Sequence, residues 1–145
     1  MTPQEKIIAI LGGAKPLGLK SKQARPSLQA QIRAGLKFSA LESLQRRYRI
    51  PLAQLQTLLD ISDRTLARRR AQQTLSKAES DRLYRIARVA VQAEEVLGST
   101  QTAERWLKEP LPALGTETPL ELLDTDEGVQ MVSDILGRIE HGVFS

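Results

Sequence analysis

The chain has 145 residues and a formal net charge of +4; 41% of its residues are apolar and only 3% are aromatic. This length suits one domain or two small ones, with a core of aliphatic side chains. The absence of cysteine excludes disulfides, thiolate metal sites and cysteine nucleophiles. No apolar run approaches the roughly 18–20 residues of a membrane span, and the N-terminus lacks the apolar stretch of a secretory signal. We therefore expect a cytosolic protein and, because β-branched and alternating runs are few, an all-α fold.

The charge is unevenly distributed along the chain. Residues 1–72 carry 14 Lys+Arg against 4 Asp+Glu, whereas residues 73–145 carry 7 against 13. The first half is thus basic and the second acidic. Soluble proteins usually intersperse their charges, so this asymmetry indicates two surfaces with different partners. The basic half is expected to contact nucleic acid.

Residues 1–26 are expected to form a flexible basic arm. Residues 4–11 can form a short apolar helical turn or a strand, but residues 12–26 combine five glycines and prolines with four lysines and arginines. Turn formers and like charges disfavour a stable element there. The segment can contact phosphate or the DNA minor groove, or it can be an ordinary solvated linker. No GxxxxGK[ST] motif is present.

Three signals predict the helices that follow the arm. Ser27 caps a short helix with one apolar stripe, and Ser39 to Glu42 match a capping box that opens the next helix. Pro51 ends that helix and starts another. Tyr48 is expected in the core, while three arginines beside it can reach DNA backbone: Arg46, Arg47 and Arg49.

The stretch from Leu52 to Arg70 reads as helix, tight turn and helix. Leucines at helical spacing give the first segment one apolar face, and Ser62 can cap the second. In DNA-binding versions of this motif the second helix lies in the major groove. Asp63–Arg70 is therefore the expected recognition helix. The alternative is a structural corner with a solvated run of arginines.

This stretch resembles the helix-turn-helix of Xre/Cro-type repressors. The match rests on Leu59-Asp60-Ile61-Ser62, Thr65-Leu66 and Arg68. It departs at Asp60, where a glycine is usual, and at Gln56, where a small residue usually packs. Residues 27–74 would form the DNA-binding domain. First-turn side chains would reach base edges and the arginines phosphates, which gives this set: Ser62, Asp63, Arg64, Thr65, Arg68, Arg69 and Arg70.

Capping signals also organise the second half. Ser76 and Glu79 form a capping box before the longest helical pattern, which should stop at Gly98. A short helix is predicted over residues 100–108, with Trp106 as a core anchor, and two prolines enforce an extended crossing over residues 110–115. A third capping box, residues 118–121, opens a helix of about one turn. The last helix begins after Thr125 and ends at Gly142.

Residues 75–145 resemble the toxin-binding domain of Xre/ParS-type antitoxins. The match rests on Leu75-Ser76, Glu79-Ser80-Asp81-Arg82, Arg85, Ala87-Arg88-Val89, Ala103, Trp106-Leu107, Leu111 to Gly115, Thr118 to Leu123 and Gly137 to Ser145. The resemblance implies a partner, a RES-domain toxin that consumes NAD, and repression of the operon that encodes both proteins. It also implies that the C-terminal segment reaches the toxin's active-site cleft through Arg138, Glu140, His141, Gly142, Val143, Phe144 and Ser145.

That segment has an alternative interpretation and a specific expectation. The chain end can fold back on the last helix, with Phe144 filling a gap in the core. We instead expect Val143, Phe144 and the carboxylate of Ser145 to project beyond the helix and occlude entry of NAD to the toxin.

Enzymatic activity is not expected. His141 is the only histidine, which excludes a multi-histidine metal site, and the acids near residues 124–127 are explained by helix capping and the helix dipole. No catalytic, cofactor or metal site is therefore predicted. Because one helix-turn-helix contacts few base pairs, we expect a homodimer on two-fold operator DNA. The competing function is a stand-alone helix-turn-helix transcriptional regulator without a toxin partner.

Overall fold

The computed structural model describes residues 3–11 and 27–142, and in these ranges the predicted all-α class is confirmed. The described helices are α1 (Pro3–Ile10), α2 (Leu28–Ala34), α3 (Phe38–Tyr48), α4 (Leu52–Leu59), α5 (Asp63–Gln72), α6 (Lys77–Leu97), α7 (Thr100–Lys108) and α8 (Asp126–Glu140), with the 3₁₀ turns η1 (Pro112–Leu114) and η2 (Glu121–Asp124). Within the expected basic arm, residues 1–26, the described residues 3–11 form helix α1 and the turn after it, and Ile7, Ile10 and Leu11 are buried in the core. The rest of the arm, residues 12–26, lies outside the described residues.

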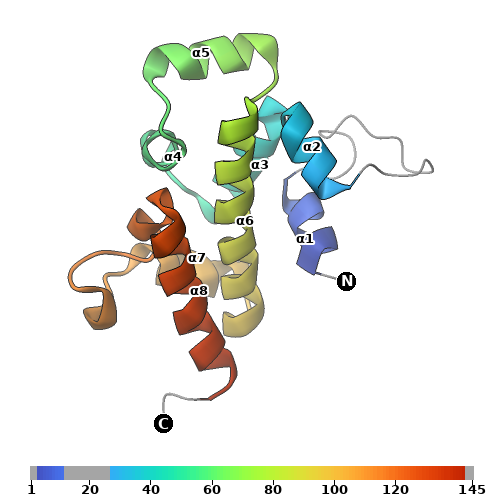
Figure 1. The fold of residues 1–145 in the computed structure, drawn as a ribbon. Coiled ribbons are helices and arrows are strands. Elements are labelled where there is room, and N and C mark those ends of the chain that lie inside the picture. Colours follow the sequence, from blue (N-terminus) through green and yellow to red (C-terminus); the bar gives the residue numbers. More distant parts are fainter. Residues whose placement is uncertain (1–2, 12–26, 143–145) are drawn as a thin grey trace.

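Helix α6 is the central support of the molecule (Figure 1). Its predicted capping box is present: the Glu79 amide donates to Ser76 Oγ at 3.1 Å, and the Ser76 amide donates to Glu79 Oε1 at 2.9 Å. Gly98 ends the helix in the left-handed region (φ 95°), as predicted. Helices α1, α2, α4, α7 and α8 all pack against α6. One hydrophobic cluster therefore extends from Ile7 to Leu136 and joins the basic and acidic halves.

Helix α8 runs parallel to α6. Arg85 forms an ion pair with Asp126 at the start of α8. Two turns further along both helices, Ser133 Oγ donates to Gln92 Oε1 at 2.8 Å. The predicted start after Thr125 is confirmed, since the Gly128 amide donates to Thr125 Oγ1 at 3.0 Å. The α8 side chains that face α6 are apolar and buried: Val129, Val132, Ile135 and Leu136.

The capping box predicted at Ser39 is wrong. Helix α3 begins at Phe38, after Lys37, and no side chain caps it. The Phe38 amide instead donates to the carbonyl of Gln73 at 3.0 Å, and the Phe38 ring is buried in the core. This pairing across 35 residues places the helix start two residues earlier than the local Ser-x-x-Glu pattern indicates.

Residues 35–38 lie against the chain segment that follows α5. Besides the Phe38 bond, the Leu75 amide donates to the Leu36 carbonyl at 2.8 Å, and the Leu36 amide donates to Ser80 Oγ at 2.8 Å. Gly35 adopts φ 97°, and a Cβ there would overlap the Leu75 carbonyl oxygen. This close approach requires glycine. It anchors the exit of α5 to the body of the protein.

Three further predictions differ in detail from the structure. The expected extended crossing over residues 110–115 contains a 3₁₀ turn, η1, because Pro112 is well suited to the first position of such a turn. Pro51 precedes α4 as its capping residue, where its carbonyl accepts from the Leu55 amide at 3.1 Å. Trp106 is half-buried and packs against the core cluster rather than inside it.

Candidate functional site

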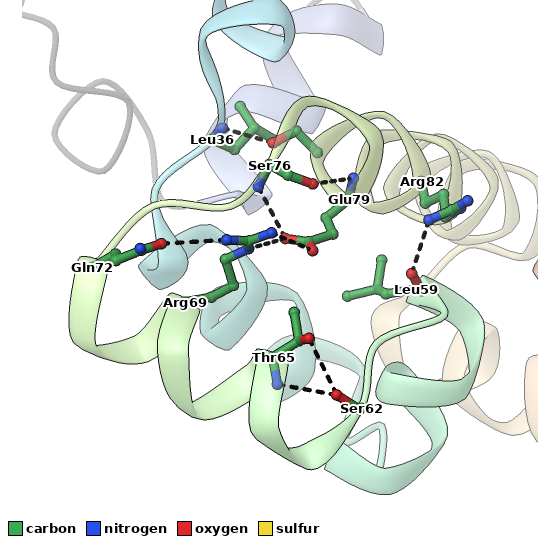
Figure 2. Close-up of polar contacts among 10 residues, drawn as sticks. Leu36, Leu59, Ser62, Thr65, Arg69, Gln72, Ser76, Glu79 and Arg82 are labelled. Carbon is green, nitrogen blue, oxygen red and sulfur yellow. Dashed lines mark hydrogen bonds and ion pairs between the residues drawn. The ribbon is translucent and has the colours of Figure 1, made fainter.

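The turn between α4 and α5 has the predicted helix-turn-helix geometry (Figure 2). Asp60, which stands where glycine is usual, adopts the left-handed conformation (φ 56°, ψ 51°) that ends α4. Aspartate tolerates this conformation better than most residues. Ser62 then caps α5 by accepting from the Thr65 amide at 3.1 Å and by donating to Thr65 Oγ1 at 3.1 Å.

Gln56, the second departure from the repressor pattern, has a specific contact. Its Nε2 donates to Asp63 Oδ1 at 2.8 Å, which joins α4 to the first turn of α5. The glutamine therefore replaces close packing of a small residue with a hydrogen bond between the two helices. The sequence alone does not indicate this contact, because Asp63 lies seven residues after Gln56, beyond the turn between the two helices.

The outward face of α5 is basic. Arg64 and Arg68 are exposed and one helical turn apart, with exposed Ala67 and Ala71 beside them. Within the described part of the chain, no hydrogen bond or ion pair engages either guanidinium. Small residues between two arginines allow close approach of a polyanionic surface, as phosphate recognition requires. Direct contact of this face with DNA stays a prediction.

The other two arginines of the run differ from Arg68. The exposed Arg70 lies over the ring of Phe38, with its guanidinium carbon 5.4 Å from the ring centroid. Arg69 turns inward, where Nε donates to Glu79 Oε1 at 2.7 Å and Nη2 to Glu79 Oε2 at 3.1 Å, while Nη1 donates to Gln72 (Figure 2). The structure thus brings Arg64 and Arg68 together on one face and separates Arg69 from them.

The pair formed by Arg69 and Glu79 is shielded, with side-chain exposures of 18% and 7%. Burial opposes ionisation of Glu79, but hydrogen bonds from Arg69 and the Ser76 amide outweigh burial and lower the pKa of the carboxyl. The same hydrogen bond raises the pKa of Arg69. Both groups are therefore charged at neutral pH, and their contact links α5 to the first turn of α6.

A second buried carboxylate lies near the other end of α6. Glu94 accepts from Arg47 at 2.8 Å, from the Tyr48 hydroxyl at 3.1 Å and from Thr100 at 2.9 Å, and Lys6 lies 3.2 Å away. Burial opposes ionisation here as well, but these hydrogen bonds lower the pKa of Glu94 to about 2. The core position predicted for Tyr48 is confirmed, and burial raises the pKa of its hydroxyl.

This second cluster places the α3 arginines far from α5. Fifteen residues of α6 separate Glu79 from Glu94, about 22 Å along the helix axis. Arg47 forms an ion pair with Glu94. Arg46 and Arg49 instead line a groove together with Arg105 and Lys108 of α7. The positive charge of the first half is therefore divided between two separate surfaces.

The C-terminal end of α8 lies at the opposite end of the molecule from α5 (Figure 1). Helix α8 ends at Glu140, and His141 and Gly142 follow it as exposed residues. The imidazole of His141 lies 3.7 Å from the Glu140 carboxylate, and Arg138 is exposed on the last turn. Val143, Phe144 and Ser145 lie outside the described residues, so the structure bears only on the first four of the predicted toxin-binding positions.

Two kinds of site are absent from the described ranges. Residues 3–11 and 27–142 contain no group of three or more His, Cys, Asp or Glu side chains placed to hold a metal ion. None of their helices combines the length and apolar character needed to cross a membrane.

Comparison with protein families divides the chain into two matched regions. Residues 27–88 match the antitoxin Xre-like helix-turn-helix domain, and residues 92–142 match the antitoxin Xre/MbcA/ParS C-terminal toxin-binding domain. The two matches meet inside α6. The expected division at residue 75 stays a prediction.

The similar curated proteins are also antitoxins. The chain is 34% identical over 116 residues to Antitoxin Xre of Yersinia enterocolitica, an alignment that covers 79% of this chain and 78% of the relative. It is 31% identical over 122 residues to Antitoxin Xre of Photorhabdus laumondii, covering 83% and 82%. It is 38% identical over 82 residues to the Prs ADP-ribosylating antitoxin of a Sphingobium species, covering 50% and 52%. The helix-turn-helix, the second helical region and these relatives agree, and the chain belongs to the Xre antitoxins of toxin–antitoxin systems.

Proposed function

We propose that this antitoxin has two activities. It neutralises a RES-domain toxin, an enzyme that consumes NAD, and it represses its own operon by binding operator DNA through α5. The observation that carries the proposal is the placement of the two candidate surfaces at opposite ends of α6. One molecule therefore has room for a DNA duplex at α5 and for a protein beside the end of α8. Both partners would be met in the cytoplasm, where operator DNA lies.

On the DNA side, α5 would lie in the major groove with its first turn at the base edges. Arg64 is the residue best placed for base readout, since it is exposed in the first turn, and Arg68 is best placed for phosphate contact. The helix presents only about three turns, so high affinity would come from two copies on a two-fold operator. We therefore expect a homodimer on DNA.

On the toxin side, residues 138–145 would enter the cleft that binds NAD. The segment combines charged and polar side chains with a single aromatic anchor, Phe144, which can bury apolar area in such a cleft. Support for an NAD-consuming partner comes also from the name of the Sphingobium relative, because ADP-ribosylation takes its ADP-ribose from NAD. Neutralisation would then be exclusion of NAD from the active site.

The test is inhibition of the toxin that copurifies from the native operon. Full-length antitoxin is expected to stop NAD consumption, whereas a variant without Val143–Ser145 is expected to bind the toxin and leave it active. The control is operator binding, which should be the same for both forms because α5 is untouched. Equal inhibition by both forms would contradict occlusion and move neutralisation to the body of the second region.

Two readouts separate the proposed toxin from its alternatives. Release of free nicotinamide and ADP-ribose indicates NAD hydrolysis, whereas radiolabel transferred from NAD to a protein indicates ADP-ribosylation. If no toxin copurifies and no neighbouring reading frame encodes one, the protein acts as a transcriptional regulator by itself.

A further inference from the structure

Helix α5 has little apolar packing to set its rotation about its own axis. Leu66 is its one buried side chain, and it is 6% exposed. One buried leucine sets roughly which side of α5 faces the body of the protein, but it constrains the rotation loosely because hydrophobic contact is non-directional. Directional contacts must supply the remaining precision.

Three hydrogen-bonded contacts from other parts of the chain reach α5 or its ends, in addition to the Arg70 guanidinium over the Phe38 ring. The Gln56 bond to Asp63 is exposed, and the Phe38 bond to Gln73 lies just beyond the last turn. The third, between Arg69 and Glu79, is the shielded one and joins both carboxylate oxygens to two guanidinium nitrogens. A bidentate pair of this kind is stronger and more specific in geometry than an exposed hydrogen bond.

The same contact makes Arg69 a poor candidate for phosphate binding. Each of its three guanidinium nitrogens donates a hydrogen bond within the protein. Swinging the side chain toward DNA would leave the Glu79 carboxylate, 7% exposed, without its cation. Removing one partner from a buried ion pair is strongly unfavourable. Arg68, one residue earlier and exposed, has no such constraint.

We propose that Arg69 is a positioning residue for DNA reading: through Glu79 it fixes the rotation of α5 on α6, so that Arg64 and Arg68 face the duplex. The inference rests on the proposed function, since it concerns how the same helix binds operator DNA. It gives the three consecutive arginines different roles. Arg68 contacts phosphate, Arg69 orients the helix, and Arg70 covers Phe38.

The test compares Arg69→Met with Arg68→Met in the full chain. The probes are a duplex covering the region upstream of the coding sequence and a duplex of the same length with shuffled sequence. Arg68→Met should weaken binding to both duplexes alike and reduce the slope of log K against log salt by about one. Arg69→Met should lower the ratio of the two affinities roughly tenfold, because base readout by Arg64 requires an exact rotation of the helix. It should leave the salt slope unchanged, because the long and flexible Arg68 side chain can still reach a phosphate from a slightly rotated helix.

Glu79→Gln supplies the matched variant on the other side of the contact. Glutamine still serves the capping box at Ser76 but cannot form the ion pair. It should reproduce Arg69→Met, and the double variant should be no worse than either single one, because all three lose the same interaction. If Arg69→Met fails to fold, Arg69→Lys replaces it, since lysine keeps the charge but not the bidentate geometry.

Amide hydrogen exchange in the DNA-free protein completes the test. Arg69→Met and Glu79→Gln should each speed exchange across α5, and Arg68→Met should not. If wild-type protein fails to distinguish the two duplexes, the proposed operator binding is wrong, and faster exchange then assigns Arg69 a structural role alone. A slope reduced by about one in Arg69→Met, with exchange unchanged, would instead make Arg69 a phosphate contact and overturn the inference.

Discussion

Helices α5 and α8 both depend on α6, but they are attached by different means. Helix α8 buries Val129, Val132 and Leu136 in the common core and adds polar contacts with α6 at two levels along its length. Helix α5 buries Leu66 and depends on the ion pair between Arg69 and Glu79. Helix α8, which contains the start of the proposed toxin-binding segment, is thus part of the core. Helix α5, the proposed recognition helix, is attached to that core through a few directional bonds.

The two buried carboxylates of α6 differ in the same way. Glu79 holds one arginine and the cap of its own helix. Glu94 joins α1, α3 and α7 through Lys6, Arg47, Tyr48 and Thr100. Loss of Glu79 should therefore disturb α5 and the first turn of α6, whereas loss of Glu94 should loosen the packing of α1, α3 and α7 on α6.

Gly128→Ala should have the largest effect on stability if α8 is part of the core. A Cβ at Gly128 would overlap the backbone carbonyl oxygen of Leu122, and neither backbone can move without displacing apolar packing. We expect the free energy of unfolding to fall by about 3–4 kcal/mol. Urea denaturation followed by circular dichroism measures it, and an unchanged midpoint would contradict the close packing of α8 against η2.

Glu94→Ala should be nearly as damaging, because it leaves Arg47 and the Tyr48 hydroxyl without their acceptor. The expected loss is about 3 kcal/mol, toward the lower end for a broken buried ion pair because the Arg47 side chain is 37% exposed. Glu95→Ala is the matched control. Glu95 is 39% exposed and lies 3.9 Å from Lys6, so its loss should cost no more than about 0.5 kcal/mol.

The same carboxylate predicts a pH dependence. The pKa of Glu94 is lowered to about 2 in the folded protein, against roughly 4.3 for an unperturbed glutamate. A depressed folded-state pKa stabilises the protein above the unfolded pKa, and this stability is lost as pH falls toward the folded pKa. Wild-type stability should therefore decline between about pH 5 and pH 2 more steeply than that of Glu94→Gln. Parallel acid titrations would show that Glu94 is not the group responsible.

Gly137→Ala should change stability less and in the opposite direction from Gly128→Ala. Gly137 lies in the same helix, but no atom lies within 4 Å of an added Cβ. Alanine in a helix interior is favoured over glycine by about 0.5–1 kcal/mol, so this variant should be more stable than wild type. A decrease would mean that the glycine's flexibility is needed near the end of α8.

Arg64→Ala and Arg68→Ala should have the smallest effects on stability. The free energy of unfolding should change by no more than about 0.5 kcal/mol, since both side chains are exposed on the outer face of α5. Their effects should appear on DNA. Arg64→Ala should reduce discrimination between operator and shuffled duplex, and Arg68→Ala should weaken both. Unchanged operator affinity in the folded double variant, measured by titration at several salt concentrations, would remove α5 from the DNA interface.

Signals confined to a few neighbouring residues predicted most helix boundaries. Capping hydrogen bonds lie within one helical turn, so the capping residues can be recognised from their spacing alone. Examples are Ser62, Ser76 with Glu79, Gly98 and Thr125. The capping box at Ser39 failed because the Phe38 amide bonds to Gln73, a partner far along the chain. Local pattern carries no information on such a pairing.

The candidate site was predicted as a region, but not the roles of its arginines. Arg68, Arg69 and Arg70 look alike in the sequence, but helical spacing separates Arg68 from the other two, since Arg69 and Arg70 follow the buried Leu66 by three and four residues. Spacing alone does not show that Arg69 contacts Glu79 while Arg70 lies over Phe38. The partner of Arg69 could not be identified, because that contact depends on how α5 crosses the start of α6.

The continuous helix α6 fixes the distance between the proposed DNA surface at α5 and the proposed toxin surface at the end of α8. The helix runs through the point where the two family matches meet, with no linker between them. Its 21 residues span about 31 Å, close to one turn of B-DNA. If a flexible linker joined the two regions, a bound toxin would have a broad distribution of distances from the DNA. A continuous helix works instead as a fixed spacer, and fluorophores on α5 and at the end of α8 should report one narrow distance.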